Sequence, residues 1–402
     1  MAQTTKMSML SCGRFPPRFV DYESEADMAD ILVALSGGVD SSAAAALLVS
    51  QGHNVVGVTL KLWGGESDSG CCSVSDVDDA RRVAQQLDID HHVFNFGDDF
   101  DRFVVDPYVA DHQNGRTPNP CVECNRHIKF DKLFRRADAL GFDLIATGHH
   151  ARISQDADGV RRISRGADEA KDQSYVLHML DQAQLARLSF PVGDITKDEV
   201  RGLAHKLGLR TADKPDSQDV CFIHSEGGRQ VFLGDRISLR PASLVDAEGA
   251  EVGQVDSIEL VTLGQRKGLN LGGDAGRRYV VDIDHQASKV TVGSEADLLV
   301  TGQQLDDLAW SDQPLEGEFL VQCSAHGQPR LATLDGSSIV WAQPERRVAP
   351  GQSIVLYRGD DVVGGGTAGP ALVSIGRSGS LAGTGNSSEL ETETAAVDST
   401  DR

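Results

Sequence analysis

One stretch near the start of the chain constrains the fold more than any other. An apolar run at Ile31–Leu35 leads through Ser36, Gly37 and Gly38 into an alanine-rich run that begins at Ser41. This order predicts a strand, a tight glycine turn and a helix in direct succession. The glycines permit unusual backbone dihedral angles and a close approach to a ligand. Because the helix would begin with unpaired N–H groups and the positive end of its dipole, the turn is predicted to bind phosphate.

The residues of this turn also indicate which kind of nucleotide site it forms. The Gly-Lys-Ser/Thr of a P-loop and the Gly-x-Gly-x-x-Gly of a dinucleotide fold are both missing from it. The segment Ser36-Gly37-Gly38-Val39-Asp40-Ser41 instead resembles the signature of the ATP pyrophosphatases, which cleave ATP between its α and β phosphates. Asp40 cannot bind a phosphate directly, but a carboxylate there is suited to hold the Mg²⁺ that the phosphates share.

Length and composition limit the remaining possibilities. A chain of 402 residues, of which 40% are hydrophobic, predicts about two or three domains with real cores. The sequence contains no apolar run of the roughly 18 residues that a membrane-spanning helix needs. Seven unevenly spaced cysteines fit a reducing cytoplasm better than a secreted disulfide framework. The formal net charge of -22 argues against a nucleic-acid partner unless a basic face exists locally.

The order of predicted elements gives a domain plan. Residues 1–28 and 378–402 lack an apolar period and are expected to be a disordered leader and a disordered acidic tail. Between 29 and 214, apolar strands alternate with amphipathic helices, which predicts an α/β domain with a parallel sheet covered on both faces. The predicted strands after the first are Asn54–Leu62, His91–Phe96 and Leu144–Thr147, and the helices include Ser75–Leu87, Arg126–Leu140 and Lys197–Leu207.

After residue 214 the helical period gives way to short alternating runs with frequent glycine. This texture predicts a small central β-rich domain at 215–295 and a C-terminal β-barrel at 296–377. The predicted strands are Ser257–Thr262, Tyr279–Asp284, Lys289–Val292, Phe319–Gln322, Ser338–Gln343 and Ser353–Tyr357.

A second informative stretch carries Cys121 and Cys124. Pro118 and Pro120 predict an extended, exposed backbone just ahead of these cysteines. The basic residues that follow would lie on the first turns of a helix, where positive charge and the helix N-terminus lower a thiol pKa. The spacing suits a redox pair, half of a zinc site or part of an iron–sulfur site. Because the chain has no second Cys-x-x-Cys, a structural zinc site is not expected.

Other residues add weaker indications. Gly148 and His149 follow a predicted parallel strand, at the sheet edge where ligands bind in open α/β folds. Arginines at 161, 162 and 165, together with Lys171 and the basic helix, form the best candidate for a phosphate-backbone patch. Cys71 and Cys72 are adjacent, so they are not expected to share a metal.

Taken together, these motifs resemble the tRNA-specific 2-thiouridylases, from about residue 30 to about residue 375. The family is ATP-dependent and replaces the C2 oxygen of the wobble uridine of tRNA by sulfur, so this resemblance implies adenylation of that oxygen, release of pyrophosphate and attack by cysteine-borne sulfur. The matching segments are Ser36–Ser42, Gly115–Pro120 with Cys124 and Asn125, Ala146–His149, Lys171–Tyr175, Cys221–Ile223 and Thr262–Leu269.

The resemblance also implies roles for individual residues. Cys221 would carry the sulfur as a persulfide, and Cys124 would be the partner nucleophile that can close a disulfide onto it. The implied ATP-binding residues are Ala34, Leu35, Ser36, Gly37, Gly38, Val39, Asp40, Ser41, Leu60 and Gly148. The implied contacts with tRNA and its flipped-out base are Asn119, Pro120, Cys121, His149, Lys171, Asp172, Gln173 and Gln352. The implied partners are tRNA and a sulfur-donor protein such as a cysteine desulfurase or a relay carrier, with no membrane.

The chain departs from some relatives in two places. Cys121 stands where they carry Asp, so Cys121, Cys124 and Cys221 could together hold a [4Fe-4S] cluster whose open iron binds hydrosulfide. This route and the cluster-free persulfide route both stay open. Around Cys323–Gly327 a family segment with basic and aromatic tRNA contacts is replaced, so no residues are assigned from it.

Two other functions compete with this interpretation. A different ligase or amidotransferase with the same ATP loop would need neither Cys124 nor Cys221. A non-enzymatic RNA-binding or iron–sulfur sensing protein would not release pyrophosphate in the presence of tRNA.

Overall fold

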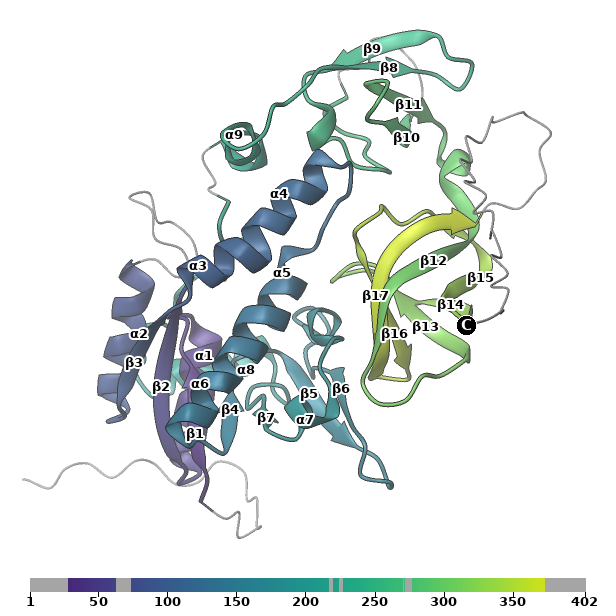
Figure 1. Cartoon of the computed structure of the whole chain (residues 1–402). Helices are drawn as coiled ribbons and strands as arrows, with labels where there is room; N and C mark the ends of the chain where they lie inside the picture. The colour runs from purple at the N-terminus through teal and green to yellow at the C-terminus, as the bar shows by residue number, and fades with distance from the viewer. Residues whose placement is uncertain are drawn as a thin grey trace, which may run out of the picture.

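A computed structural model of the chain describes residues 28–62, 74–216, 220–223, 227–269, 271 and 277–372 (Figure 1). Nearly all of the predicted leader, the predicted acidic tail, and Cys71 and Cys72 lie outside these residues. No helix in the described ranges is both long and apolar enough to cross a membrane.

The first part of the chain is built on a five-stranded parallel sheet in the order β3-β2-β1-β4-β7, which confirms the predicted α/β architecture. Alternate residues of β1 point to opposite faces, as strand geometry requires. Ile31 and Val33 pack with the alanines of α1, whereas Leu32 packs with Ile128 and other apolar residues of the cysteine-bearing helices. The strands are β1 (Asp30–Ala34), β2 (Asn54–Lys61), β3 (His91–Asn95), β4 (Leu144–Ala146) and β7 (Leu188–Ser189).

Helices cover both faces of this sheet, as continuous apolar strands require. On one face lie α1 (Val39–Ser50), α2 (Val74–Gln86) and α8 (Lys197–Lys206), whose apolar residues share one core cluster. On the other face lie two long helical runs. The first consists of α3 (Gly97–Phe100), η1 (Asp101–Val105) and α4 (Asp106–Gln113), and the second of α5 (Pro120–Glu123), η2 (Cys124–Lys132) and α6 (Leu133–Leu140).

The second run begins earlier than the sequence predicted. The helix expected from Arg126 starts at Pro120, so both cysteines lie within it. Just ahead of them the backbone is extended at Asn119, as predicted, but residues 116–119 are only partly exposed. Proline fits the first helical position because its missing N–H has no partner there in any case. Asn119 caps the helix by accepting a hydrogen bond from the Cys121 backbone N–H at 3.2 Å. The segment η2 is π-helical, a form that is frequent at functional sites.

The central part forms a four-stranded sheet in the order β10-β11-β8-β9. The strand predicted at Ser257–Thr262 was wrong, because this segment contains the short helix η4 (Ile258–Leu260). Glu259 is buried there and accepts hydrogen bonds from the backbone and side chain of Arg240, both at 2.9 Å, a distant contact that the local pattern could not reveal. The strands are β8 (Ala242–Val245), β9 (Glu251–Val255), β10 (Tyr279–Asp284) and β11 (Lys289–Gly293).

The last part is a closed antiparallel barrel of six strands in the order β12-β15-β14-β13-β16-β17, with β17 paired back to β12. This confirms the predicted C-terminal barrel. A hairpin from the first part, β5 (Ala151–Gln155) and β6 (Arg161–Arg165), extends the same sheet beside β17. The barrel strands are β12 (Leu299–Trp310), β13 (Gly317–Gln322), β14 (Arg330–Asp335), β15 (Ser338–Arg346), β16 (Ser353–Arg358) and β17 (Asp361–Leu372).

Further short helices occur in the described chain, of which α7 and α9 are labelled in Figure 1. They are η3 (Ser174–Leu177), α7 (Gln182–Leu185), α9 (Gly228–Gly234) and η5 (Glu295–Leu298).

Arg165 ties the hairpin to the barrel. Its guanidinium lies 4.0 Å from the ring centroid of Tyr357 and donates to the side-chain oxygen of Gln322 at 2.8 Å. It also pairs with the buried carboxylate of Asp172 at 3.1 Å. Removing one partner of such a pair leaves a buried charge less well compensated.

We therefore expect Arg165→Met to lower the free energy of unfolding by about 3 kcal/mol. The control is Arg135→Met, since Arg135 has a 74% exposed side chain and an ion pair with Asp131. This variant should lower the free energy of unfolding by no more than about 0.5 kcal/mol. The measurement is urea unfolding followed by fluorescence. Equal losses in the two variants would contradict a special role for Arg165.

Candidate active site

The glycine loop has the geometry that its sequence predicted. The helix α1 begins at Val39, with Gly38 as its N-cap. Gly37 has a φ of +74°, and a Cβ added there would lie 2.4 Å from the backbone oxygen of Asp76. The hydroxyl of Ser41 donates to the Gly38 oxygen at 3.1 Å and accepts from the Ser36 backbone N–H at 3.2 Å. Only glycine fits at position 37, and the first turn of α1 stays close to the loop.

Gly148 lies just after β4 and packs against the start of α1, beside the glycine loop. It follows β4, which pairs with β1, and a Cβ at Gly148 would lie 2.5 Å from the backbone nitrogen of Ser41. Leu60 is buried near the carboxyl end of β2, on the other side of β1. The predicted nucleotide-binding residues thus gather at the carboxyl edge of the sheet, where open α/β folds bind ligands.

Asp40 is the charged centre of this edge. The ammonium of Lys197 lies 2.7 Å from each of its carboxylate oxygens, and the Nε2 atom of His150 lies 3.1 Å from Oδ1. Burial alone would raise the pKa of Asp40, but the hydrogen bonds with His150 and Lys197 outweigh it and leave the pKa below its ordinary value. No local sequence pattern indicated that Lys197 or His150 would lie at this site.

Asp216 extends this arrangement beyond Asp40. It pairs with Lys197 at 2.8 Å, with Lys171 at 2.7 Å and with Arg201 at 2.9 Å. Burial would raise its pKa, but the hydrogen bonds from Lys171 and Lys197 lower it to about 2. Asp40, Lys197, Asp216 and Lys171 therefore form a continuous chain of ion pairs, which we call the carboxylate–lysine chain.

Lys214 also holds the glycine loop in place. Its ammonium donates to the backbone oxygen of Gly37 at 2.9 Å and to the carboxylates of Asp76 at 2.6 Å and Asp79 at 2.9 Å. Because Asp76 also crowds Gly37 through its backbone, the start of α2 and the glycine loop are held as one unit. The local sequence gave no signal for this contact, which joins residues far apart in the chain.

The three cysteines of interest differ in exposure. Cys121 is exposed, Cys124 is buried and Cys221 is intermediate. Phe222, next to Cys221, packs against Phe100 and Tyr108 with ring centroids 5.7 and 5.3 Å apart. Within the described parts of the chain, no three His, Cys, Asp or Glu side chains are grouped so that they could hold a metal ion.

His149 is held inside the protein. It is 8% exposed, its Nδ1 atom lies 2.6 Å from the Thr147 hydroxyl, and its ring contacts the rings of Phe130 and Phe190. Burial lowers the pKa of His149 well below its ordinary value, so the ring is neutral at pH 7.

The remaining residues predicted to contact tRNA are distributed between two places. Gln173 accepts from the His150 backbone N–H at 2.9 Å, and the Asp172 carboxylate accepts from Arg165, Ser174 and the Gly166 backbone. Asn119 and Pro120 begin α5. Gln352 reaches from the barrel to donate to the Thr117 backbone oxygen at 2.6 Å, so the barrel contacts the segment that leads to the cysteines.

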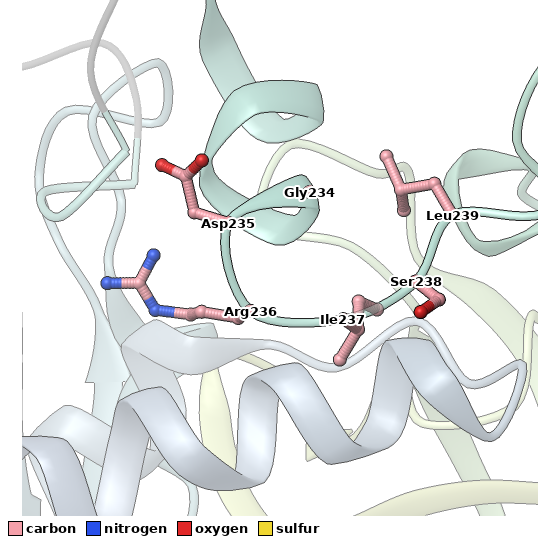
Figure 2. A pocket seen from close by; sticks show the side chains of 6 residues that line it. All are labelled: Gly234, Asp235, Arg236, Ile237, Ser238 and Leu239. Atoms are coloured by element: carbon pink, nitrogen blue, oxygen red, sulfur yellow. The ribbon is translucent and has the colours of Figure 1, made fainter.

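A shallow pocket lies elsewhere, where α9 ends (Figure 2). Arg236 packs over the Phe232 ring at 4.0 Å and donates to the Phe232 backbone oxygen at 2.9 Å. None of the predicted site residues lines this pocket, and we assign no role to it. Its lining residues are Gly234, Asp235, Arg236, Ile237, Ser238 and Leu239.

The parallel sheet, the glycine loop at the end of β1 and the acidic residue in the first turn of α1 define an α/β protein of the ATP pyrophosphatase type. Comparison with known families matches residues 29–225 to the tRNA methyl transferase HUP domain, 230–294 to the tRNA methyl transferase PRC-barrel domain and 305–368 to the aminomethyltransferase beta-barrel domain.

The similarity to named proteins extends over most of the chain. The chain is 47% identical over 352 residues to the tRNA-specific 2-thiouridylase MnmA of Chloroflexus aurantiacus, and the match covers 84% of this chain and 98% of the relative. It is 44% identical over 355 residues to the protein of the same name from Carboxydothermus hydrogenoformans, covering 84% and 96%. The chain belongs to the tRNA-specific 2-thiouridylase family, as its motifs indicated.

Solved structures are more distantly similar. A 4-thiouridine synthetase–RNA complex with bound ATP is 16% identical, with a TM-score of 0.33, over 48% of this chain and 45% of that chain.

The loop geometry yields a test with a closely matched control. Gly37 and Gly52 both have positive φ, so alanine at either should cost about 1 kcal/mol of stability from backbone strain. Only at position 37 would the new methyl group also meet another backbone segment, because nothing lies within 4 Å of a Cβ at Gly52. We expect Gly37→Ala to weaken ATP binding at least about tenfold in calorimetric titration. Equal ATP affinities in the two variants would show that the loop does not bind ATP.

Proposed function

We propose that this protein is an ATP-dependent tRNA-uridine 2-sulfurtransferase, which converts the wobble uridine of tRNA to 2-thiouridine and releases AMP and pyrophosphate. One observation carries the proposal: Cys124 and Cys221 both pack with the core that includes Leu32, on the strand that leads into the ATP loop, in a chain 47% identical to a 2-thiouridylase over 84% of its length. The cytoplasm is the proposed site of action.

The glycine loop would serve the first step, in which the uracil C2 oxygen attacks the α phosphorus of ATP. The bond between the α and β phosphates breaks, and pyrophosphate leaves. The backbone N–H groups at the start of α1 point to where phosphate would lie, and Gly37 and Gly148 leave room for it. Asp40 has the right chemistry for a Mg²⁺ ion shared with the phosphates, which would spread the charge of the leaving group.

Cys221 and Cys124 would serve the second step. The terminal sulfur of a Cys221 persulfide attacks C2, and AMP leaves. The Cys124 thiolate then attacks the Cys221 sulfur, so the sulfur–sulfur bond to the uridine breaks and 2-thiouridine is released. The resulting Cys124–Cys221 disulfide is reopened by a thiol reductant, which supplies two electrons. A sulfur-donor protein, such as a cysteine desulfurase or relay carrier, restores the persulfide.

The substrate uridine would be held beside the cysteine helix. Asn119, Pro120 and Cys121 lie at the start of that helix, and the neutral, buried ring of His149 suits contact with an uncharged base. Lys171, Asp172, Gln173 and Gln352 remain proposed tRNA contacts. The bonds that Asp172 already makes with Arg165 and Ser174 support a role in shaping this region.

We also propose the domain limits that the sequence indicated. The ATP domain would extend from 29 to 214, the central domain from 215 to 295 and the barrel from 296 to 377. A leader and an acidic tail would lie outside them.

Single alanine substitutions test the sulfur steps. Cys221→Ala and Cys124→Ala should abolish 2-thiouridine formation, because each removes a sulfur atom that changes bonds, while tRNA-dependent pyrophosphate release should persist. Cys323→Ala is the control, since that thiol lies in the barrel and burial raises its pKa to about 12. Nucleoside mass spectrometry and a pyrophosphate assay give the two readouts. Thiolation that survives in either variant would contradict the proposed route.

A further substitution separates the two sulfur routes. The cluster-free route predicts that Cys121→Asp retains thiolation with a persulfide donor, and that anaerobically purified wild-type protein lacks stoichiometric iron and sulfide. About four irons and four sulfides per chain, lost in the variant together with thiolation, would instead establish a cluster.

A further inference from the structure

Lys197 occupies an unusual position for a lysine. It is the first residue of α8, it is only 7% exposed, and its ammonium lies between two carboxylates that come from different parts of the chain. A capping box at Thr196 and a bond from the Lys197 backbone N–H to Asp168 at 3.0 Å fix the start of the helix. The residue is thereby aimed at the first turn of α1, where the phosphate-binding loop ends.

We propose that Lys197 takes the place of the divalent cation at Asp40 while the site is without nucleotide, and turns to the departing pyrophosphate when Mg²⁺ and ATP bind. This inference rests on the proposed use of ATP. It assigns Lys197 two roles that the family resemblance does not give it: excluding free metal, and stabilising the leaving group.

The geometry at Asp40 supports the first role. Both carboxylate oxygens lie 2.7 Å from the same ammonium, so the oxygens that a metal ion would use are already neutralised. A metal ion must therefore displace Lys197 from Asp40 before it can bind there. Two cations that compete for one carboxylate oppose each other's binding, whereas the negative phosphates of ATP favour both.

Asp216 supports the second role. It lies 2.8 Å from the Lys197 ammonium and is itself held by Lys171 and Arg201. When Asp40 turns to a metal ion, Lys197 remains tethered at Asp216 instead of leaving for solvent. Three cations then face a single carboxylate, an excess of positive charge that suits pyrophosphate. A lysine side chain can move its ammonium from Asp40 to pyrophosphate in this way, because it carries a compact charge on a flexible four-carbon chain.

Binding of Mn²⁺, an EPR-visible substitute for Mg²⁺, tests the first role without any catalytic readout. Without nucleotide, Lys197→Met should bind Mn²⁺ about tenfold more tightly than wild type. The gain should vanish in the double variant Lys197→Met/Asp40→Asn, which separates this site from other acidic positions. Lys289→Met, an exposed lysine in β11, is the matched control and should leave Mn²⁺ affinity unchanged.

Pyrophosphate binding tests the second role by calorimetry. Lys197→Met should bind pyrophosphate about tenfold more weakly in the presence of Mg²⁺, the opposite direction to its effect on Mn²⁺ alone. Unchanged affinity for both probes, or a parallel loss of both, would overturn the inference. If wild-type protein fails to bind ATP with Mg²⁺, the proposed function fails; if it binds ATP and Lys197→Met behaves like wild type, only this inference fails.

The variant should remain folded, because Asp40 keeps His150 and Asp216 keeps Lys171 and Arg201 as partners. Thermal unfolding checks this. Lys197→Arg retains the charge and gives an independent test if the methionine variant is unstable: it should continue to exclude Mn²⁺. An arginine variant that gains Mn²⁺ affinity would overturn the inference, because charge would not be the cause.

Discussion

The pairing of Asp40 with Lys197 is the interaction on which the rest of the site depends. A carboxylate in the first turn of α1 would by itself repel the phosphates that the loop is shaped to hold. With Lys197 beside it the carboxylate is neutralised, and the positive end of the α1 dipole is preserved. Asp216 and Lys171 continue the same pairing, so the nucleotide loop, the start of α8 and Lys171 share one electrostatic network.

The barrel is attached to this site through backbone as well as side chains. Its sheet is extended by the β5–β6 hairpin, and Gln352 holds the Thr117 backbone oxygen just ahead of the cysteine helix. The backbone of Thr117 also donates to the Pro350 oxygen at 2.7 Å. A shift of the barrel would therefore move the start of α5, which gives a physical reason why the C-terminal part belongs to the enzyme and is not an independent attachment.

The strongly acidic composition is compatible with a polyanionic substrate because charge is distributed unevenly. The net charge of -22 describes the whole chain, including many acidic residues outside the described parts. Around the glycine loop, by contrast, the cations Lys171, Lys197, Arg201 and Lys214 are matched by the carboxylates of Asp40, Asp76, Asp79 and Asp216, so this region is close to neutral. Steering of a charged substrate depends on such local fields and not on the sum over the chain.

The sequence by itself determined the elements that depend on neighbouring residues. The apolar run, glycines and alanines of residues 31–46 predicted a strand, a turn and a helix. The alternation of strands and helices, followed by short strands, predicted the parallel sheet and the barrel. The tertiary structure alone decided which charges meet. Asp40 and Lys197 are 157 positions apart, so no local pattern could pair them. Tertiary contacts also replaced the strand expected at Ser257–Thr262 with a short helix and buried Cys124 on a helix that starts at Pro120. The physical reason is that hydrophobic periodicity and turn chemistry act over a few residues, whereas ion pairing and burial are settled only when distant segments pack together.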